Sequence, residues 1–455
     1  MSSATSRPEV LRRDLRAMTA DGVFFSIMVG LGETYVPAFA LALGHGPAAS
    51  GLMGTLPLLA GACLQLVTPH GVVRLRSYRR WVVHCARLQA LCLLPLAASA
   101  LAGRGPLLWL LAVASAYWGF SMATGPAWNA WATRLVPVRL RARFFAHRSR
   151  SAQAALLLAL LFSGALLEAG RRRGLELEAF AALFALAAGA RLISAHFLSS
   201  QSERQGAVDD HRALPLGAIR ASLRSRGSTR VLAYLLAMQV AAQIAAPFFT
   251  PYMLGPLDLS YERFTALIAA SFLARIAILP GLGRLAQHRG SRFILVAGAI
   301  GIVPLPPLWL VSHDFAYLLA LQLVSGCAWA AVEYASLLSF FEGIDERDRA
   351  SVLSFFNLAN ASALAAGSVL GGSLLRGLGA GEHAYAWLFA VSSLARLATL
   401  LLLRGAPAGH GLPRGLELRT VAVRPASGGV QRPVLAPGGR GEPEPAEETA
   451  GRTRP

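Results

Sequence analysis

Three ionisable side chains stand deep inside long apolar stretches of this sequence: Glu33, Arg275 and Glu333. A charge at that depth of an apolar layer is costly, so each of them is a candidate for function. Glu33 stands about twelve residues, roughly 18 Å of helix, into its apolar stretch, and a carboxylate there could take up a proton or pair with a cation. The alternative is a structural acid that is hydrogen-bonded between two helices.

Arg275 stands about ten residues, or ~15 Å of helix, from the nearer end of its apolar stretch, which is further than its side chain reaches. It therefore needs an internal partner, which we expect to be Glu33, Glu333 or an anionic solute. Glu333 is equally suited to binding a ligand or proton and to anchoring a gate between helices. Both roles stay open for Glu333.

Polar and aromatic residues at helical spacing occur in the same apolar stretches. Tyr117, Ser121 and Trp128 recur at spacings that place them on one helix face. These residues, together with the amide side chains of Gln239, Gln243 and Asn357, could bind a drug-like or sugar-like solute. Alternatively, they could form helix-to-helix hydrogen bonds worth about 1 kcal/mol each. The residues predicted to bind the solute or a proton are Glu33, Glu333, Arg275, Tyr117, Ser121, Trp128, Gln239, Gln243, Trp329 and Asn357.

Four further basic side chains in apolar stretches are weaker signals. His84, Arg87 and Arg191 stand close enough to a predicted helix end to extend toward lipid headgroups. Arg396 is intermediate in depth. We expect all four to serve packing or headgroup contacts rather than a solute site.

The elements that carry these residues are predicted to be membrane helices. The chain has 455 residues, of which 55% are hydrophobic and only 15% charged, which is too apolar for an ordinary soluble protein. A helix of about 20 apolar residues crosses the hydrocarbon layer and satisfies its own backbone groups there. Twelve spans are predicted, at 22–42, 47–69, 81–102, 106–134, 145–169, 178–198, 229–254, 262–283, 293–312, 315–341, 352–375 and 384–404.

The spans predict an all-α membrane protein built from two halves. Residues 22–198 form the first six-helix bundle and residues 229–404 the second. Residues 1–21 are expected to be a cytoplasmic N-terminal segment, and the polar, basic residues 199–228 a cytoplasmic linker. Residues 405–455 are rich in Gly, Pro, Arg and Glu without apolar periodicity, which predicts a disordered cytoplasmic tail.

The distribution of arginine predicts the orientation. The net charge is +19, and the arginines gather in the connections on the side of the N-terminus. Positive residues stay in the cytoplasm, so the charge reflects topology rather than nucleic acid, and both termini should lie inside the cell. The exception is Arg171–Arg173 on the outer side, where Glu168, Glu176 and Glu178 can neutralise the cluster.

The connection after the eighth span contains a specific motif. Residues 283–292 read GRLAQHRGSR, in which Gly283, Leu285, Ala286, Gly290 and Arg292 fit the pattern G-x-L-a-D-r-x-G-x-r and Gln287 replaces the acid. That pattern is the hallmark loop of the major facilitator superfamily, which the chain also resembles in its six-plus-six spans. An eroded copy at 71–80 has Leu75 in place of the acid. The resemblance assigns Gly283, Leu285, Gln287, Gly290, Arg292, Arg141 and Arg349 to the gating loops.

The resemblance implies a fold and a mechanism. Two bundles would rock about a central site, with spans 1, 4, 7 and 10 lining the cavity. A lone acid in span 1, here Glu33, is similar to that of drug/proton antiporters in the superfamily, which favours proton-coupled export of an amphipathic or cationic solute. An importer of a sugar, amino acid or organic anion, with Arg275 as the anion contact, is the alternative. The loss of both loop acids also leaves open a non-transporting membrane sensor.

No enzyme signature is found in the sequence. Gly281-Leu282-Gly283 is not followed by a strand–helix phosphate unit, and no Walker loop is present. We therefore expect no enzyme activity, no cofactor and no metal site. The expected partners are a small solute, H⁺ and the lipid bilayer, without nucleic acid, for a monomer in the cell (inner) membrane.

Overall fold

The computed structural model describes residues 7–203, 226–343, 349–379 and 381–403. Within these residues every regular element is a helix, as predicted. Eleven apolar helical segments of the described chain are long enough to cross a membrane, and the longest of them, Tyr261–Leu308, covers both the eighth and the ninth predicted spans. The predicted tail and most of the predicted linker lie outside the described residues.

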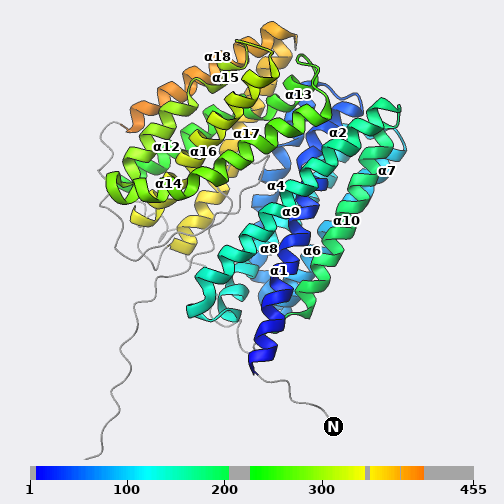
Figure 1. The fold of residues 1–455 in the computed structure, drawn as a ribbon, viewed down its shortest axis with the longest axis vertical. Coiled ribbons are helices and arrows are strands. Elements are labelled where there is room, and N and C mark those ends of the chain that lie inside the picture. Colours follow the sequence, from blue (N-terminus) through cyan, green and yellow to red (C-terminus); the bar gives the residue numbers. More distant parts are fainter. Residues whose placement is uncertain (1–6, 204–225, 344–348, 380, 404–455) are drawn as a thin grey trace, which may run out of the picture.

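The helices form two bundles (Figure 1). The N-terminal bundle consists of α1 (Arg7–Leu31), η1 (Glu33–Tyr35), α2 (Val36–Ala42), α3 (Pro47–Met53), α4 (Leu56–Gln65), α5 (Thr68–Leu75), α6 (Tyr78–Leu91), α7 (Leu93–Leu101), α8 (Leu107–Leu135), α9 (Val138–Arg172) and α10 (Glu176–Ser200). The C-terminal bundle consists of α12 (Arg226–Gln243), η2 (Ala246–Phe248), α13 (Phe249–Leu254), α14 (Tyr261–Ile302), α15 (Leu305–Leu308), α16 (Phe315–Gly343), α17 (Arg349–Gly377), α18 (Glu382–Thr399) and η3 (Leu400–Leu403).

The first helix of each bundle is interrupted at a corresponding place. Between α1 and α2 lies the 3₁₀ turn η1, and between α12 and α13 lies η2, which contains Pro247. Gly30 allows α1 to lie close to α9, because a Cβ there would come within 2.8 Å of Ala159 Cβ. The sequence predicted Glu33 in a continuous helix; the structure instead places it in η1, at a break between two helices.

The predicted loop at 283–292 is mostly helical. Residues 261–302 form one long element that changes direction at Gly290, whose φ of 76° and ψ of 165° are not helical. A positive φ is readily adopted only by glycine, which explains the glycine at this point of the motif. Spans eight and nine are therefore two helices joined by a one-residue kink.

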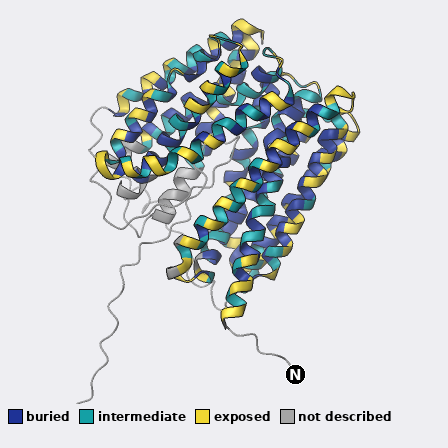
Figure 2. Ribbon diagram, viewed as in Figure 1, coloured by how far each residue is buried: buried dark blue, intermediate teal, exposed yellow. Residues whose placement is uncertain are grey.

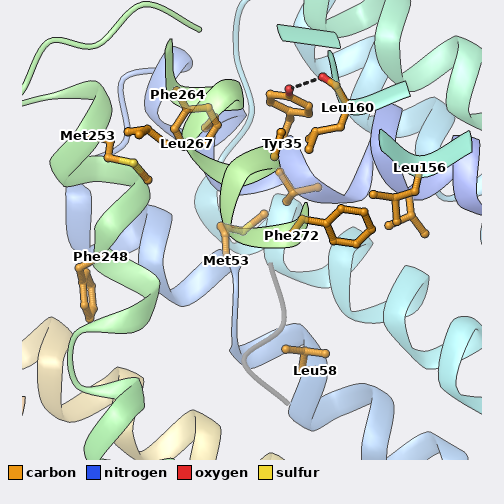
Figure 3. Packing of buried hydrophobic residues seen from close by; sticks show 14 of the residues in the cluster. Tyr35, Met53, Leu58, Leu156, Leu160, Phe248, Met253, Phe264, Leu267 and Phe272 are labelled. Carbon is orange, nitrogen blue, oxygen red and sulfur yellow. Dashed lines mark hydrogen bonds between the residues drawn. The ribbon is translucent and has the colours of Figure 1, made fainter. Parts of the chain in front are cut away.

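The two bundles meet at the end that carries α2, α13 and the start of α14, which we call the closed end, and diverge toward the end where α1 begins (Figure 1). Tyr35 spans the junction: its hydroxyl donates to Leu160 O at 2.9 Å and lies 2.8 Å from Thr265 Oγ1 of the other bundle (Figure 3). Gly51 packs against the Phe248 ring across the same junction. The closed end is thus sealed by side-chain packing.

Apolar side chains also cover much of the outside of both bundles. Exposed residues alternate with buried ones along each helix (Figure 2), and many of the exposed ones are large and apolar, such as Leu108, Leu158 and Trp387. A surface with so many exposed large apolar side chains fits a lipid environment rather than water.

Candidate functional site

A central cavity of about 480 Å³ lies between the bundles, within the usual range for small-molecule sites. Its walls include residues of both bundles, from Pro37 and Met253 near the closed end to Phe145 and Leu198 toward the opposite, open end, where α1 begins. The cavity therefore lies between the two bundles, where the sequence analysis expects the central site.

Glu33 lines this cavity although its side chain is largely buried. The hydroxyl of Tyr117, on α8, donates to Glu33 Oε2 at 2.9 Å. Tyr117 is outside the cavity lining, so of this hydrogen-bonded pair only Glu33 belongs to the wall.

Arg275 has the partner that its depth requires. Its Nη1 donates to Glu333 Oε1 at 2.9 Å, and both side chains are only 12% exposed. Arg275 lines the cavity, whereas Glu333 lies outside the lining. Of the partners predicted for Arg275, the structure selects Glu333, and the pair contributes little net charge to the cavity wall.

The remaining predicted solute-site residues divide into three groups. Ser121, Trp128, Gln243 and Trp329 line the cavity. Gln239 is buried in α12 away from the lining, and Asn357 lies outside the residues whose side chains are described. The neighbouring Asn360 lines the cavity.

The sequence analysis missed a chain of charged contacts in the N-terminal bundle. Asp21 Oδ2 accepts a hydrogen bond from Arg148 Nη2 at 3.2 Å, and Asp21 Oδ1 accepts one from Ser194 Oγ at 2.7 Å. Arg191 Nη1 in turn donates to Ser194 Oγ at 2.7 Å, and Arg191 Nε donates to Gln89 Oε1 at 2.8 Å. Asp21 was the signal available in the sequence, but it stands next to the predicted start of its span, where hydropathy gives no reason to expect burial.

The lipid-headgroup contact predicted for Arg191 and Arg396 was wrong, whereas the packing role predicted beside it is not contradicted. Both side chains are 2% exposed and line the cavity. Each stacks on an aromatic ring, Phe25 for Arg191 and Trp329 for Arg396. Depth along a helix predicted that Arg191 could reach the surface, but the rotation of the helix turns it inward. His84 and Arg87 are exposed, as that assignment expected.

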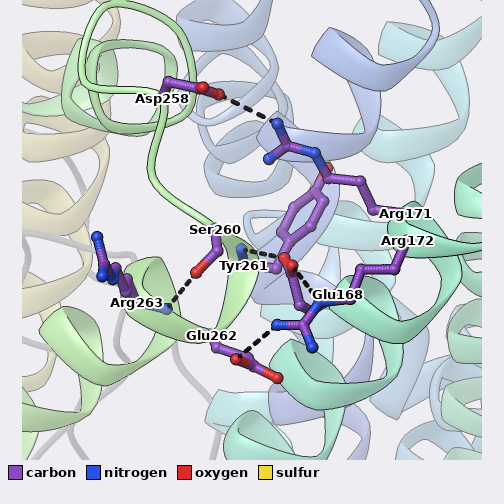
Figure 4. A network of polar contacts seen from close by, with 8 residues as sticks. All are labelled: Glu168, Arg171, Arg172, Asp258, Ser260, Tyr261, Glu262 and Arg263. Carbon is purple, nitrogen blue, oxygen red and sulfur yellow. Dashed lines mark hydrogen bonds and ion pairs between the residues drawn. The ribbon is translucent and has the colours of Figure 1, made fainter.

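Polar contacts link the bundles at the closed end (Figure 4). Glu168 accepts a hydrogen bond from Arg172 Nε at 2.9 Å and another from the backbone N–H of Tyr261, in the opposite bundle, at 3.0 Å. Arg172 also donates to Glu262 at 3.2 Å, and Arg171 donates to Asp258 at 3.1 Å.

The acids of the C-terminal bundle were not foreseen as partners of the Arg171–Arg173 cluster. Of the predicted ones, Glu168 contacts Arg172, while Glu176 accepts a hydrogen bond from the Tyr261 hydroxyl at 2.5 Å. The cluster is therefore paired within its own bundle by Glu168, as predicted, and also connects the two bundles through Asp258 and Glu262.

The predicted gating residues have local structural contacts. Arg141 Nε donates to Val136 O at 2.9 Å, which supports the turn between α8 and α9. Arg292 Nη2 donates to Leu403 O at 3.5 Å, and Gly283, Leu285 and Gln287 lie within α14. The side chain of Arg349 lies outside the described side chains.

An acid from the start of the linker serves the eroded loop at 71–80. Glu203 accepts from the hydroxyl of Ser77 and from the backbone N–H of Arg79 at 3.2 Å, at the N-terminus of α6. A carboxylate is favoured at a helix N-terminus because of the unpaired N–H groups there. Glu203 thus supplies a negative charge to this loop although Leu75 stands where the family has its acid.

Comparisons with known proteins place the fold. No family model matches the sequence, and no curated protein matches it. Among solved structures, a point mutant of the nucleoside transporter NupG superimposes with a TM-score of 0.71 at 11% identity, over 86% of this chain and 99% of that one. A POT family transporter in complex with a thioalcohol-conjugated peptide gives 0.65 at 14% identity, over 87% and 96%.

A bacterial homologue of the human lysosomal transporter Spinster, in an inward-facing and unoccupied conformation, gives a TM-score of 0.55 at 16% identity, over 89% of this chain and 96% of that one. These likenesses confirm the all-helical, two-bundle major facilitator fold that the sequence predicted. The three solved structures that share this fold are described as transporters.

Proposed function

We propose that this protein is a secondary transporter, which moves a small solute across a cell membrane by alternating access. The observation that carries the proposal is a cavity of solute size at the junction of two bundles that meet at one end only. Rocking of the bundles about such a site would open it to each side in turn. The three solved transporters that share this fold support the same function.

The arginine distribution along the sequence supports an inward-facing state. The end where α1 begins is the end predicted to be cytoplasmic, so the closed end would be the outer one. The cavity then opens to the cytoplasm, from which an exported solute would enter. An importer also passes through this state, so export remains our prediction from the resemblance of Glu33 to the acid of drug/proton antiporters.

Glu33 is the group that we propose couples transport to protons. It is a carboxylate that lines the solute cavity while being largely buried, so solute and proton can compete for one site. The hydrogen bond from Tyr117 holds the carboxylate in place. Competition between solute and proton at a single acid is sufficient to link their opposite movements.

The experiment uses inverted membrane vesicles with an imposed pH gradient and three probes of different charge: ethidium, indole-3-acetate and glucose. We expect gradient-dependent flux of at least one probe, lowered at least about tenfold in Glu33→Gln because loss of one charged contact is worth more than about 1.4 kcal/mol. The control is Glu382→Gln, the same chemical change at an exposed helix start, which should leave the flux unchanged.

The outcomes separate the proposed functions. Equal coupling in wild type and Glu33→Gln would contradict the proton role. Absence of flux for all three probes would contradict transport and favour a non-transporting sensor. An importer that uses Arg275 as its anion contact is a weaker candidate, because Glu333 already neutralises Arg275.

A further inference from the structure

The last helix of each bundle carries the same arginine. Residues 179–194 read AFAALFALAAGARLIS and residues 384–399 read AYAWLFAVSSLARLAT, so the two segments align without a gap. Arg191 and Arg396 occupy the same position of this repeat, in α10 and α18. The duplicated pattern and the shared cavity lining identify them as equivalent residues of the two bundles.

The guanidinium of Arg191 has side-chain acceptors within its own bundle, one of which contacts the Asp21 carboxylate that Arg148 pairs with. This guanidinium donates to the Ser194 hydroxyl, which donates onward to Asp21, and it also donates to Gln89. A buried charge needs such acceptors, and a nearby carboxylate, to offset the loss of hydration.

The guanidinium of Arg396 has no such side-chain acceptor among the described residues. Its Nη1 donates to Ile302 O at 2.7 Å and its Nη2 to Ala242 O at 3.4 Å, both of them backbone carbonyls. Its Nε is buried and has no hydrogen-bond partner in the described part of the chain. No carboxylate of residues 7–203, 226–343, 349–379 or 381–403 whose side chain is described lies within ion-pair distance of it.

The missing carboxylate can be traced along the sequence. When the two 3₁₀ turns are aligned, so that Tyr35 corresponds to Phe248, the position of Asp21 corresponds to Tyr234. Tyr234 is fully buried, and its hydroxyl has no hydrogen-bond partner among the residues that the structure describes. The C-terminal bundle has therefore kept the arginine but has an uncharged residue in place of the acid.

The neighbouring cavity wall also lacks a surplus of negative charge. Within the described chain, the charged residues that line the cavity are Asp21, Glu33, Arg148, Arg191, Arg275 and Arg396. Asp21 is engaged by Arg148 and Ser194, and Arg275 by Glu333. Arg396 is left as a buried cation on the wall, which favours a solute that carries an anionic group at this end of the cavity.

We propose that Arg396 binds an anionic group, a carboxylate or a phosphate, of the transported solute, which supplies the counter-charge that this bundle lacks. A planar guanidinium suits both groups. Trp128 Nε1 and Gln153 Oε1, which belong to the wall of the N-terminal bundle and are buried without partners among the described residues, provide a donor and an acceptor for the other end of the solute. The proposal rests on the proposed function, because it names the solute class of the same cavity.

The test measures binding to purified protein in nanodiscs with two matched pairs of probes: indole-3-acetate with indole-3-acetamide, and glucose 6-phosphate with glucose. We expect wild type to prefer the anion in at least one pair. In Arg396→Gln that anion should bind about thirtyfold more weakly, as for other truncated buried charge contacts, with the neutral partner unchanged. Arg396→Lys should bind the anion with intermediate affinity because it keeps the charge.

A matched control is Arg263→Gln, which removes an exposed arginine that stacks on Phe315 outside the cavity and should bind as wild type does. Equal binding of anion and neutral partner by wild type in both pairs would overturn the proposal, as would unchanged anion affinity in folded Arg396→Gln. If Arg396→Gln does not fold, the comparison of wild type with Arg396→Lys replaces it, and equal anion affinity of those two counts against the guanidinium contact.

Failure of this inference and failure of the proposed function give different results. Anion-selective binding without flux would leave the inference intact and contradict transport. Flux of an uncharged probe, with no preference for its anion, would support transport and contradict the anion site.

Discussion

The two bundles share an apolar framework but differ in how they place charge. Both carry the repeated segment that contains Arg191 or Arg396, and both interrupt their first helix with a 3₁₀ turn. The N-terminal bundle adds Asp21 and Glu33 near the cavity, whereas the aligned positions of the C-terminal bundle are Tyr234 and Ala246. The apolar positions that pack helices have been kept in both copies, and the acids have not.

This difference indicates a division of roles. In the N-terminal bundle Asp21 pairs with Arg148 and accepts from Ser194, which in turn accepts from Arg191, so we expect these contacts to contribute to stability. In the C-terminal bundle the described partners of Arg396 are carbonyl groups, and its charge remains available to a ligand. We propose that these asymmetric charges on a symmetric framework form a site whose two walls recognise different ends of a solute.

The largest expected effect follows from the removal of the Asp21 carboxylate. Asp21→Asn keeps the shape but leaves Arg148 and Arg191 without their negative charge, so we expect the free energy of unfolding to fall by about 3–5 kcal/mol. The measurement is unfolding in mixed micelles by a denaturing detergent.

Asp258→Asn is the control for Asp21→Asn. It removes the exposed pair with Arg171, and the φ of 40° at this position is well suited to asparagine, so stability should change by less than about 0.5 kcal/mol. Equal losses in the two variants would contradict the role assigned to Asp21 as the charge balance of its bundle.

An intermediate effect is expected for the pair in the other bundle. Arg275→Gln and Glu333→Gln each leave one buried charge, which should lower the free energy of unfolding by about 3 kcal/mol, while the double variant should recover at least half of that loss. The same unfolding measurement gives the coupling energy. Strictly additive losses would show that the two side chains do not act as a neutral pair.

The double variant also tests the assignment of the anion contact. Arg275→Gln/Glu333→Gln should keep the preference for an anionic probe, because we assign that contact to Arg396. Loss of the preference in this variant would transfer the contact to Arg275 and restore the importer hypothesis.

Several features were accessible from the sequence because they depend on hydropathy and depth. Twelve apolar stretches define the fold, and the depth of Arg275 showed that it needs an internal partner. The kink at Gly290 and the break beside Glu33 were not predicted, because a local backbone change of one to three residues leaves the hydropathy pattern intact.

The direction of a side chain around its helix was the other property that could not be predicted. Arg191 and Arg396 stand in helices that are apolar on most sides, so hydropathy does not tell the lipid face from the cavity face. Asp21 was missed for a related reason, since its burial depends on Arg148 from a helix far along the chain. Alignment of the two halves around the repeated arginine is the sequence signal that could have identified Arg191 and Arg396 as equivalent residues.

The smallest expected effect compares two hydroxyl groups at the same position of the repeat. Ser194 links Arg191 to Asp21, whereas Thr399 donates to the backbone carbonyl of Arg396 in its own helix. Ser194→Ala should lower the free energy of unfolding by about 2 kcal/mol, because hydrogen bonds to charged groups are lost, and Thr399→Val by about 1 kcal/mol or less. Both variants are measured in the same mixed micelles. A loss for Thr399→Val that equals or exceeds that for Ser194→Ala would mean that Arg396 depends on its neighbouring hydroxyl as Arg191 does, and the charge of the C-terminal bundle would then be satisfied from within rather than by a solute.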